Sequence, residues 1–131
     1  MASFVFTKMI VADLERETAF FEQVIGLKTV MRMVVGKGDA AADEVILSAD
    51  GKSGGAPSLA LLCYRARPAP PPGELVLGFM VDDVDAVAAT AERNGGRILM
   101  APRDVPDHGL RVGFVADPEG HEIEILQPLA R

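Results

Sequence analysis

The chain has 131 residues and a mass of 13.9 kDa, which is the size of one ordinary domain. Hydrophobic residues make up 49% and charged residues 24%, a globular composition that argues against disorder along most of the chain. Thirteen Lys and Arg against nineteen Asp and Glu give a net charge of −6, which disfavours nucleic acids and anionic membranes as partners. The single cysteine, Cys63, excludes a disulfide framework and a cysteine-based zinc site.

The first residues, MASFVFTKMIVADLERE, lack the basic start and the long apolar stretch of a signal peptide. No apolar run approaches the ~20 residues that a membrane-spanning helix needs. We therefore expect a cytoplasmic protein.

Strands and helices are predicted in the same order twice. Asp13 is suited to cap a first helix, which Gly26 closes, and Asp83 to cap a second helix, which Gly95 and Gly96 end. Runs of β-branched, aromatic and other apolar residues predict the strands. The expected strands are 3–11, 28–35, 44–49, 58–64, 75–81, 97–100, 110–116 and 121–127.

The segment RARPAPPPGE, at 65–74, separates the two halves. Its prolines lack an amide donor and predict an extended linker. At an offset of seventy residues the halves share five identities, and the strand, the helix cap and the closing glycine fall in step. The sequence predicts an α+β fold: a single domain, 1–131, of two βαβββ modules at 1–64 and 74–131, joined by a linker at 65–73.

Three segments carry a resemblance to a known family: VADLERETAFFEQVIGL at 11–27, VDDVDAVAATAERNGG at 81–96 and FVADPEGHEIEIL at 114–126. In this order they resemble the vicinal oxygen chelate superfamily, the group of glyoxalases, bleomycin-resistance proteins and extradiol dioxygenases. The resemblance covers nearly the whole chain. It implies paired βαβββ modules whose curved mixed sheets surround a cup-shaped cavity for a small ligand, usually within a homodimer.

The resemblance also implies four metal-ligand positions in the cup. They fall on Phe6, Leu61, Val76 and Glu124, and only Glu124 has an atom that coordinates a metal. A catalytic divalent ion normally needs about three protein ligands and an open position. We therefore predict no cofactor; a divalent metal is disfavoured, and Glu124 would be its ligand if one were bound.

Alternation along the strands extends this set of cup residues. If Phe6 faces the cup, so does Lys8; Met80 accompanies Val76, and Glu122 accompanies Glu124. The expected ligand-binding residues are Phe6, Lys8, Leu61, Val76, Met80 and Glu122. Apolar walls with a few polar groups are typical of small-molecule pockets.

Glu124 is the main catalytic candidate, as a base or as a hydrogen-bond anchor for the ligand. The alternative is structural: Glu124 pairs with Lys8 or Arg111 and stabilises the cup. Lys8 itself either neutralises an anionic ligand or extends past the rim into water.

Three further residues have side chains that could take part in chemistry, and each also has a structural interpretation. His108, in the loop before the seventh strand, is a second catalytic candidate at the mouth of the cup, or an exposed loop residue. His121 should point away from Glu124, which favours a structural role. Cys63 is expected to lie on the cup wall beside Leu61 as a small buried side chain.

Two functions remain open. The first is a small-molecule-binding protein with a largely apolar cup and a degenerate metal site. The alternative is a lyase, isomerase or dioxygenase-type enzyme of the same superfamily that uses Glu124 as base or remaining metal ligand. The expected partners are a second copy of the chain and a small organic ligand.

Overall fold

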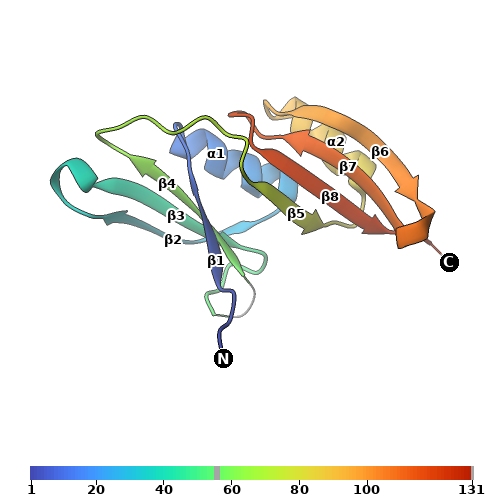
Figure 1. Ribbon diagram of the computed structural model, residues 1–131, viewed down its shortest axis with the longest axis horizontal. Coiled ribbons are helices and arrows are strands. Elements are labelled where there is room, and N and C mark those ends of the chain that lie inside the picture. Colours follow the sequence, from blue (N-terminus) through green and yellow to red (C-terminus); the bar gives the residue numbers. More distant parts are fainter. Residues whose placement is uncertain (55–56, 131) are drawn as a thin grey trace. The chain divides into compact units, whose positions relative to one another are not determined.

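The computed structural model describes residues 1–54 and 57–130, and it confirms an α+β fold with two four-stranded mixed sheets (Figure 1). The elements, in chain order, are β1 (Phe6–Ile10), α1 (Leu14–Phe20), the π-helical segment η1 (Phe21–Ile25), β2 (Lys28–Val35), the 3₁₀ turn η2 (Gly38–Ala40), β3 (Ala42–Ser48), β4 (Ser58–Tyr64), β5 (Val76–Met80), α2 (Val84–Arg93), β6 (Arg97–Val105), the 3₁₀ turn η3 (Pro106–His108), β7 (Leu110–Ala116) and β8 (Glu122–Pro128).

The chain divides into two compact units. Unit 1 comprises residues 1–22 and 26–71, and unit 2 comprises 23–25 and 72–131. The main division, between Pro71 and Pro72, falls inside the segment 65–73 that the sequence marks as a linker.

Unit 1 is built on a sheet with the strand order β1-β4-β3-β2. β1 and β4 are parallel, and the other pairs are antiparallel. Helix α1 packs on β3 and β4. Its start is fixed by the Asp13 carboxylate, which accepts a hydrogen bond from the Arg16 amide at 3.1 Å, as the sequence predicts.

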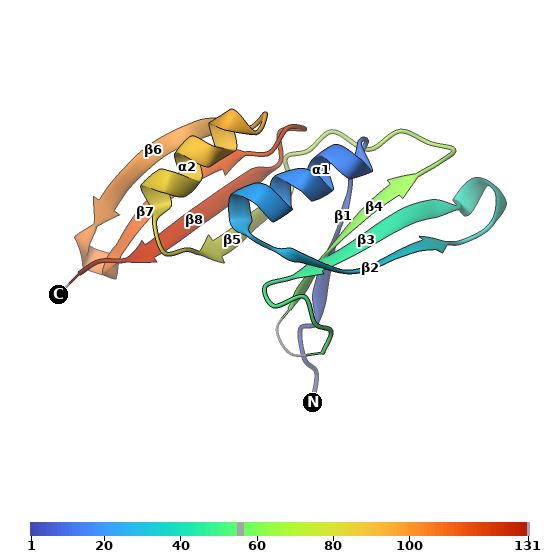
Figure 2. The same cartoon turned by 180° about the vertical axis from the view of Figure 1, so that it is seen from behind.

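Unit 2 repeats this plan with the strand order β5-β8-β7-β6, β5 and β8 being parallel (Figure 2). Helix α2 packs on β6, β7 and β8. Asp83 caps the helix by accepting from the Ala86 amide at 3.1 Å, and Val84, Ala88 and Ala91 are buried. A stripe of small and branched side chains is what a helix needs to lie close to a sheet.

The first helical stretch ends as the sequence predicts, at Gly26, which has a φ of 85°. Its last turns differ from a regular helix, because the chain winds as a π-helix from Phe21. A π-helical turn is one residue wider than an α-helical turn and is seldom visible in hydrophobic spacing.

Strand β6 is longer than expected. The sequence suggests 97–100, whereas the strand continues to Val105 across Pro102. The pairing register shifts between Ile98 and Met100 and again between Met100 and Arg103. β6 ends its sheet, and an edge strand with bulges tolerates a proline that a central strand would not.

No helix within the described residues is long and apolar enough to cross a membrane.

Candidate functional site

The sheet of unit 1 has two different faces. Lys8 pairs with Ala60 and Ala60 with Ile46, so these side chains share one face, which we call the Lys8 face. Met9, Leu61 and Val45 form the adjacent row on the opposite face, and all three are buried. The opposite face adjoins the start of α1, since the Cys63 Sγ lies 3.5 Å from the carbonyl oxygen of Ala12.

An ion pair between the exposed Lys8 and the buried Glu44 marks the Lys8 face. The Lys8 Nζ is 3.0 Å from Oε2 of Glu44, a side chain of which only 4% is exposed, whereas the Lys8 side chain is 40% exposed. The same ammonium lies 5.5 Å from the centre of the Phe6 ring. Burial of a carboxylate is costly unless a cation compensates it, so Lys8 balances Glu44.

This ion pair adjoins a cavity of about 360 Å³ in unit 1. The lining residues are Val5, Phe6, Lys8, Met33, Glu44, Ile46, Ser53, Gly54 and Ser58. The cavity therefore combines apolar side chains with one charge pair, of which only the Glu44 carboxylate is buried, and apolar walls with a few polar groups are typical of small-molecule pockets.

Glu44 is the charged residue of this cavity that the sequence does not predict. It stands at the start of the expected strand 44–49, on the same face as Ile46 by alternation. Its connection to Lys8 depends on how β4 is inserted between β1 and β3, which the sequence pattern does not specify.

Two expected positions in unit 1 need correction. The resemblance implies that Leu61 lies in the cup with Phe6, but Leu61 is in register with Met9, on the opposite face of the sheet. Cys63, expected beside it on the cup wall, shares that opposite face by alternation. Ala60 and Leu62 are the β4 residues on the Lys8 face. A shift of one residue in the register of β4 would exchange them with Leu61 and Cys63.

The opposite face of unit 1 has its own, larger hollow of about 630 Å³, beside the start of α1. Two of its acidic lining residues form ion pairs: Glu15 accepts two hydrogen bonds of 2.6 and 3.3 Å from Arg32, and Asp43 pairs with Arg65. Glu44 lines this hollow as well as the cavity on the Lys8 face. The Arg65 guanidinium lowers the pKa of the Asp43 carboxyl below its ordinary value.

The sheet of unit 2 has a comparable face, which we call the Glu124 face. Gly78, Glu124 and Phe114 form one row across β5, β8 and β7. Val76 pairs with Glu122 in the next row, and Met80 pairs with Leu126. Val76 is 49% and Met80 61% exposed, while Ile123 and Ile125 are fully buried behind the sheet.

Gly78 leaves open space beside Glu124. A Cβ atom built on Gly78 would meet no other atom within 4 Å. Because Gly78 and Glu124 are register partners, that space lies beside Glu124 on the same face of the sheet. A ligand group there would meet a half-buried acid flanked by apolar side chains.

The two cations proposed as structural partners of Glu124 have other partners. Lys8 pairs with Glu44. Arg111 binds Asp85 of helix α2 through its Nε at 2.9 Å and its Nη2 at 3.0 Å, and it also contacts Asp104. These hydrogen bonds lower the pKa of Asp85 and raise that of Arg111.

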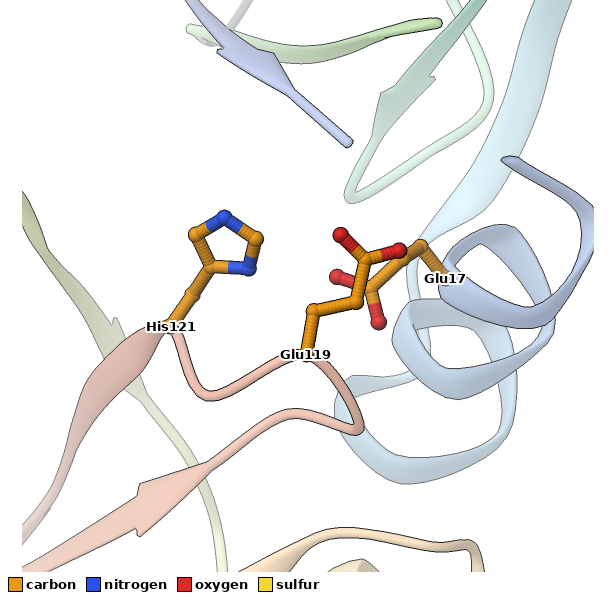
Figure 3. Close-up of side chains that lie close together, drawn as sticks. All are labelled: Glu17, Glu119 and His121. Carbon is orange, nitrogen blue, oxygen red and sulfur yellow. The ribbon is translucent and has the colours of Figure 1, made fainter. Parts of the chain in front are cut away.

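The two histidines differ in their surroundings. His108 ends the exposed turn η3. His121 is 8% exposed, and its Nδ1 is 2.8 Å from Oδ2 of Asp117. Figure 3 shows His121 and Glu119 on the turn between β7 and β8, and it also shows Glu17, a buried residue of α1 in unit 1. By alternation His121 shares the face of Ile123, opposite to Glu124.

Each unit has the element order βαβββ, and in each sheet the first strand of the unit pairs in parallel with its last strand. This arrangement defines a class of α+β proteins that are built from two such modules. The chain belongs to the Glyoxalase/Bleomycin resistance protein/Dioxygenase superfamily, whose family model matches residues 3–125.

Among curated proteins, the chain is similar to "Putative glyoxylase CFP32" of Mycobacterium bovis, with 33% identity over 110 residues. The match covers 84% of this chain but 38% of that protein, so the chain spans well under half the length of this relative. An uncharacterized protein of Mycolicibacterium smegmatis is 38% identical over 78 residues, which are 60% of this chain and 64% of that protein.

Solved structures agree in fold. A glyoxalase family protein from Bacillus cereus superimposes with a TM-score of 0.84 at 18% identity, covering 99% of this chain and 96% of that one. The glyoxalase I of Leishmania major superimposes with a TM-score of 0.76 at 23% identity, covering 97% of this chain and 87% of that one. At these identities the likeness shows the fold alone.

The four positions that the resemblance implies as metal ligands carry a single donor side chain. Phe6 and Val76 offer no donor atom, and neither do Leu61 or its neighbours Ala60 and Leu62. Glu124 alone has a carboxylate, and one carboxylate does not hold a catalytic divalent ion.

Proposed function

We propose that this chain is a cytoplasmic small-molecule-binding protein of its superfamily, with a largely apolar site and a degenerate metal centre. The observation that carries the proposal is the cavity of about 360 Å³ on the Lys8 face, where apolar side chains lie beside the buried Glu44 carboxylate and the Lys8 ammonium that pairs with it. A composition with one cysteine, and so without an internal disulfide, agrees with a reducing compartment.

Exposed apolar residues on both sheets support binding. Phe6 is 51% exposed, and Val76 and Met80 on the Glu124 face are exposed to a similar degree. Apolar surface left in contact with water marks a place where a ligand or a partner gains free energy by covering it. We also propose that a second copy of the chain covers part of this surface in a homodimer.

The proposal is tested by a metal analysis and a ligand screen on the same purified protein. Elemental analysis should find nickel, zinc, iron and manganese each well below one atom per chain. A thermal-shift screen of apolar and aromatic small molecules should find compounds that raise the melting temperature, because ligands that bind only the folded state stabilise it. Stoichiometric metal, or a screen without stabilising compounds, would contradict the proposal.

A second candidate is an enzyme of the same superfamily, a lyase, isomerase or dioxygenase-type enzyme that uses Glu124 as base or as a remaining metal ligand. The name of the mycobacterial relative and the open space beside Glu124 favour it. In this role the Glu124 carboxylate would take a proton from a substrate carbon placed over Gly78. Turnover that persists in metal-free protein and is lost in Glu124→Gln would support a base, whereas turnover that requires added metal would support a metal ligand.

A further inference from the structure

The Lys8 ammonium occupies a cation-binding position. On one side it meets the Glu44 carboxylate at 3.0 Å, and on another it faces the Phe6 ring at 5.5 Å. A carboxylate and an aromatic face are the two kinds of group that attract an ammonium most strongly away from bulk water. The Lys8 face thus carries a subsite for a positive charge, filled by a side chain of the chain itself.

Lys8 and Glu44 differ in how easily each side chain can move out of the ion pair. Glu44 is almost fully buried and lies on β3, a strand with neighbours on both sides. Lys8 lies on β1, which ends its sheet, and its flexible stem keeps the side chain 40% exposed. The ammonium can therefore move into water, whereas the carboxylate stays in place.

Charge balance favours a cation as the ligand. If a ligand ammonium replaces that of Lys8, Glu44 keeps one compensating positive charge. A ligand carboxylate would instead place a second negative charge beside Glu44, a like-charge contact in a poorly solvated position. The net charge of −6 adds a long-range attraction for cations.

The cavity also offers what Lys8 does not use. Val5, Met33 and Ile46 line it together with Phe6, and they suit the apolar body of a small molecule. A ligand with both an ammonium and an aromatic or branched aliphatic body gains this contact in addition to the charge pair. This gain lets it compete with a tethered lysine.

We propose that Glu44 is the recognition carboxylate for small organic amines, and that Lys8 occupies this position as an internal competitor. This inference rests on the proposed small-molecule-binding function and names the ligand class for the Lys8 face.

The test uses three probes that share a phenyl ring and differ in their polar group: 2-phenylethylamine, 2-phenylethanol and 3-phenylpropanoate. Binding is followed by NMR titration of backbone amides in the full chain at neutral pH. We expect the amine to bind with the highest affinity and to shift amides of β1 and β3. Glu44→Gln should weaken the amine about tenfold and leave the alcohol unchanged, because only the charge attraction is removed.

The decisive variant is Lys8→Met. Removal of the Lys8 ammonium should raise the affinity for the amine by about tenfold or more, because Glu44 is then no longer occupied by an internal cation. Lys37→Met is the matched control, because it makes the same change of charge at an exposed position outside the cavity. Lys8→Arg serves if Lys8→Met does not fold: arginine forms a stronger, two-pronged pair with the carboxylate and should weaken amine binding.

Three results would overturn the inference. If Lys8→Met weakens binding and 3-phenylpropanoate is the best probe, Lys8 is an anchor for anions. If all three probes bind equally and neither variant matters, the small-molecule function stands but the charge selectivity is wrong. If no probe shifts amides of the Lys8 face in wild type or in Lys8→Met, the binding function of this face fails as well.

Discussion

The Asp117 carboxylate closes the turn between β7 and β8 around the His121 side chain. Its Oδ1 accepts hydrogen bonds from the amides of Glu119, at 3.0 Å, and His121, at 2.9 Å, while its Oδ2 lies 2.8 Å from the imidazole Nδ1. Both residues are buried. One carboxylate thus satisfies two backbone donors and orients one ring.

Replacement of Asp117 by alanine is expected to lower the free energy of unfolding by about 3 kcal/mol, because two amides and the imidazole lose their acceptor inside the protein. Asp117→Asn should cost less, since the amide oxygen still accepts from the backbone. Urea unfolding monitored by circular dichroism measures both. Asp107→Ala, at an exposed position, is the control. If Asp117→Ala lowers the free energy of unfolding no more than Asp107→Ala does, the hydrogen bonds of Asp117 contribute little to stability.

The ion pair between Arg111 and Asp85 should make the stability of the fold pH-dependent in the acid range. Its hydrogen bonds lower the pKa of Asp85 below the ordinary value of 3.8. The ion pair therefore stabilises the fold above the unfolded pKa, and this contribution is lost as the pH falls through the folded pKa. The difference in melting temperature between wild type and Arg111→Gln should be constant above about pH 5 and shrink below it. Arg103→Gln, an exposed arginine of β6, should show no such trend.

Glu124→Gln should leave the free energy of unfolding within about 1 kcal/mol of wild type, because the amide keeps the size and the hydrogen-bonding oxygen of the acid. If Glu124 is a catalytic base, turnover should fall by roughly 10²-fold or more. If it only anchors a ligand, the affinity should weaken while turnover persists. Unchanged affinity and turnover in a titration with an identified ligand would leave Glu124 a structural role.

We expect the protein to form a homodimer in solution. Phe4, Phe6 and Met80 are 72%, 51% and 61% exposed, and a second copy of the chain that covers them would remove this apolar surface from water. Analytical ultracentrifugation at micromolar concentration should show a species of twice the chain mass. Sedimentation of a 13.9 kDa species alone would contradict this expectation.

Much of the fold could be predicted because its signals are local. The carboxylates of Asp13 and Asp83 cap the two helices, and Gly26 adopts the left-handed conformation that ends the first helical stretch. These features depend on a few neighbouring residues and repeat at a fixed offset. The order of strands and helices follows from them.

The site was less predictable because it depends on pairing between distant strands. The alternation rule places Lys8 with Phe6, yet it does not say which acid lies opposite, and Glu44 was missed. For Leu61 the same rule needs a reference residue in β4, and a shift of one position reverses the face. The sequence pattern contains neither the register of β1 on β4 nor that of β4 on β3.

The proline in β6 has a consequence for the behaviour of the protein at high concentration. An unpaired strand at the end of a sheet is a template for strand addition from another chain, the first step of β-aggregation. β6 lacks one amide donor at Pro102 and is irregular on both sides of Met100. A foreign strand would find no continuous row of hydrogen-bonding groups there, so the backbone of β6 protects this edge of the sheet against strand addition.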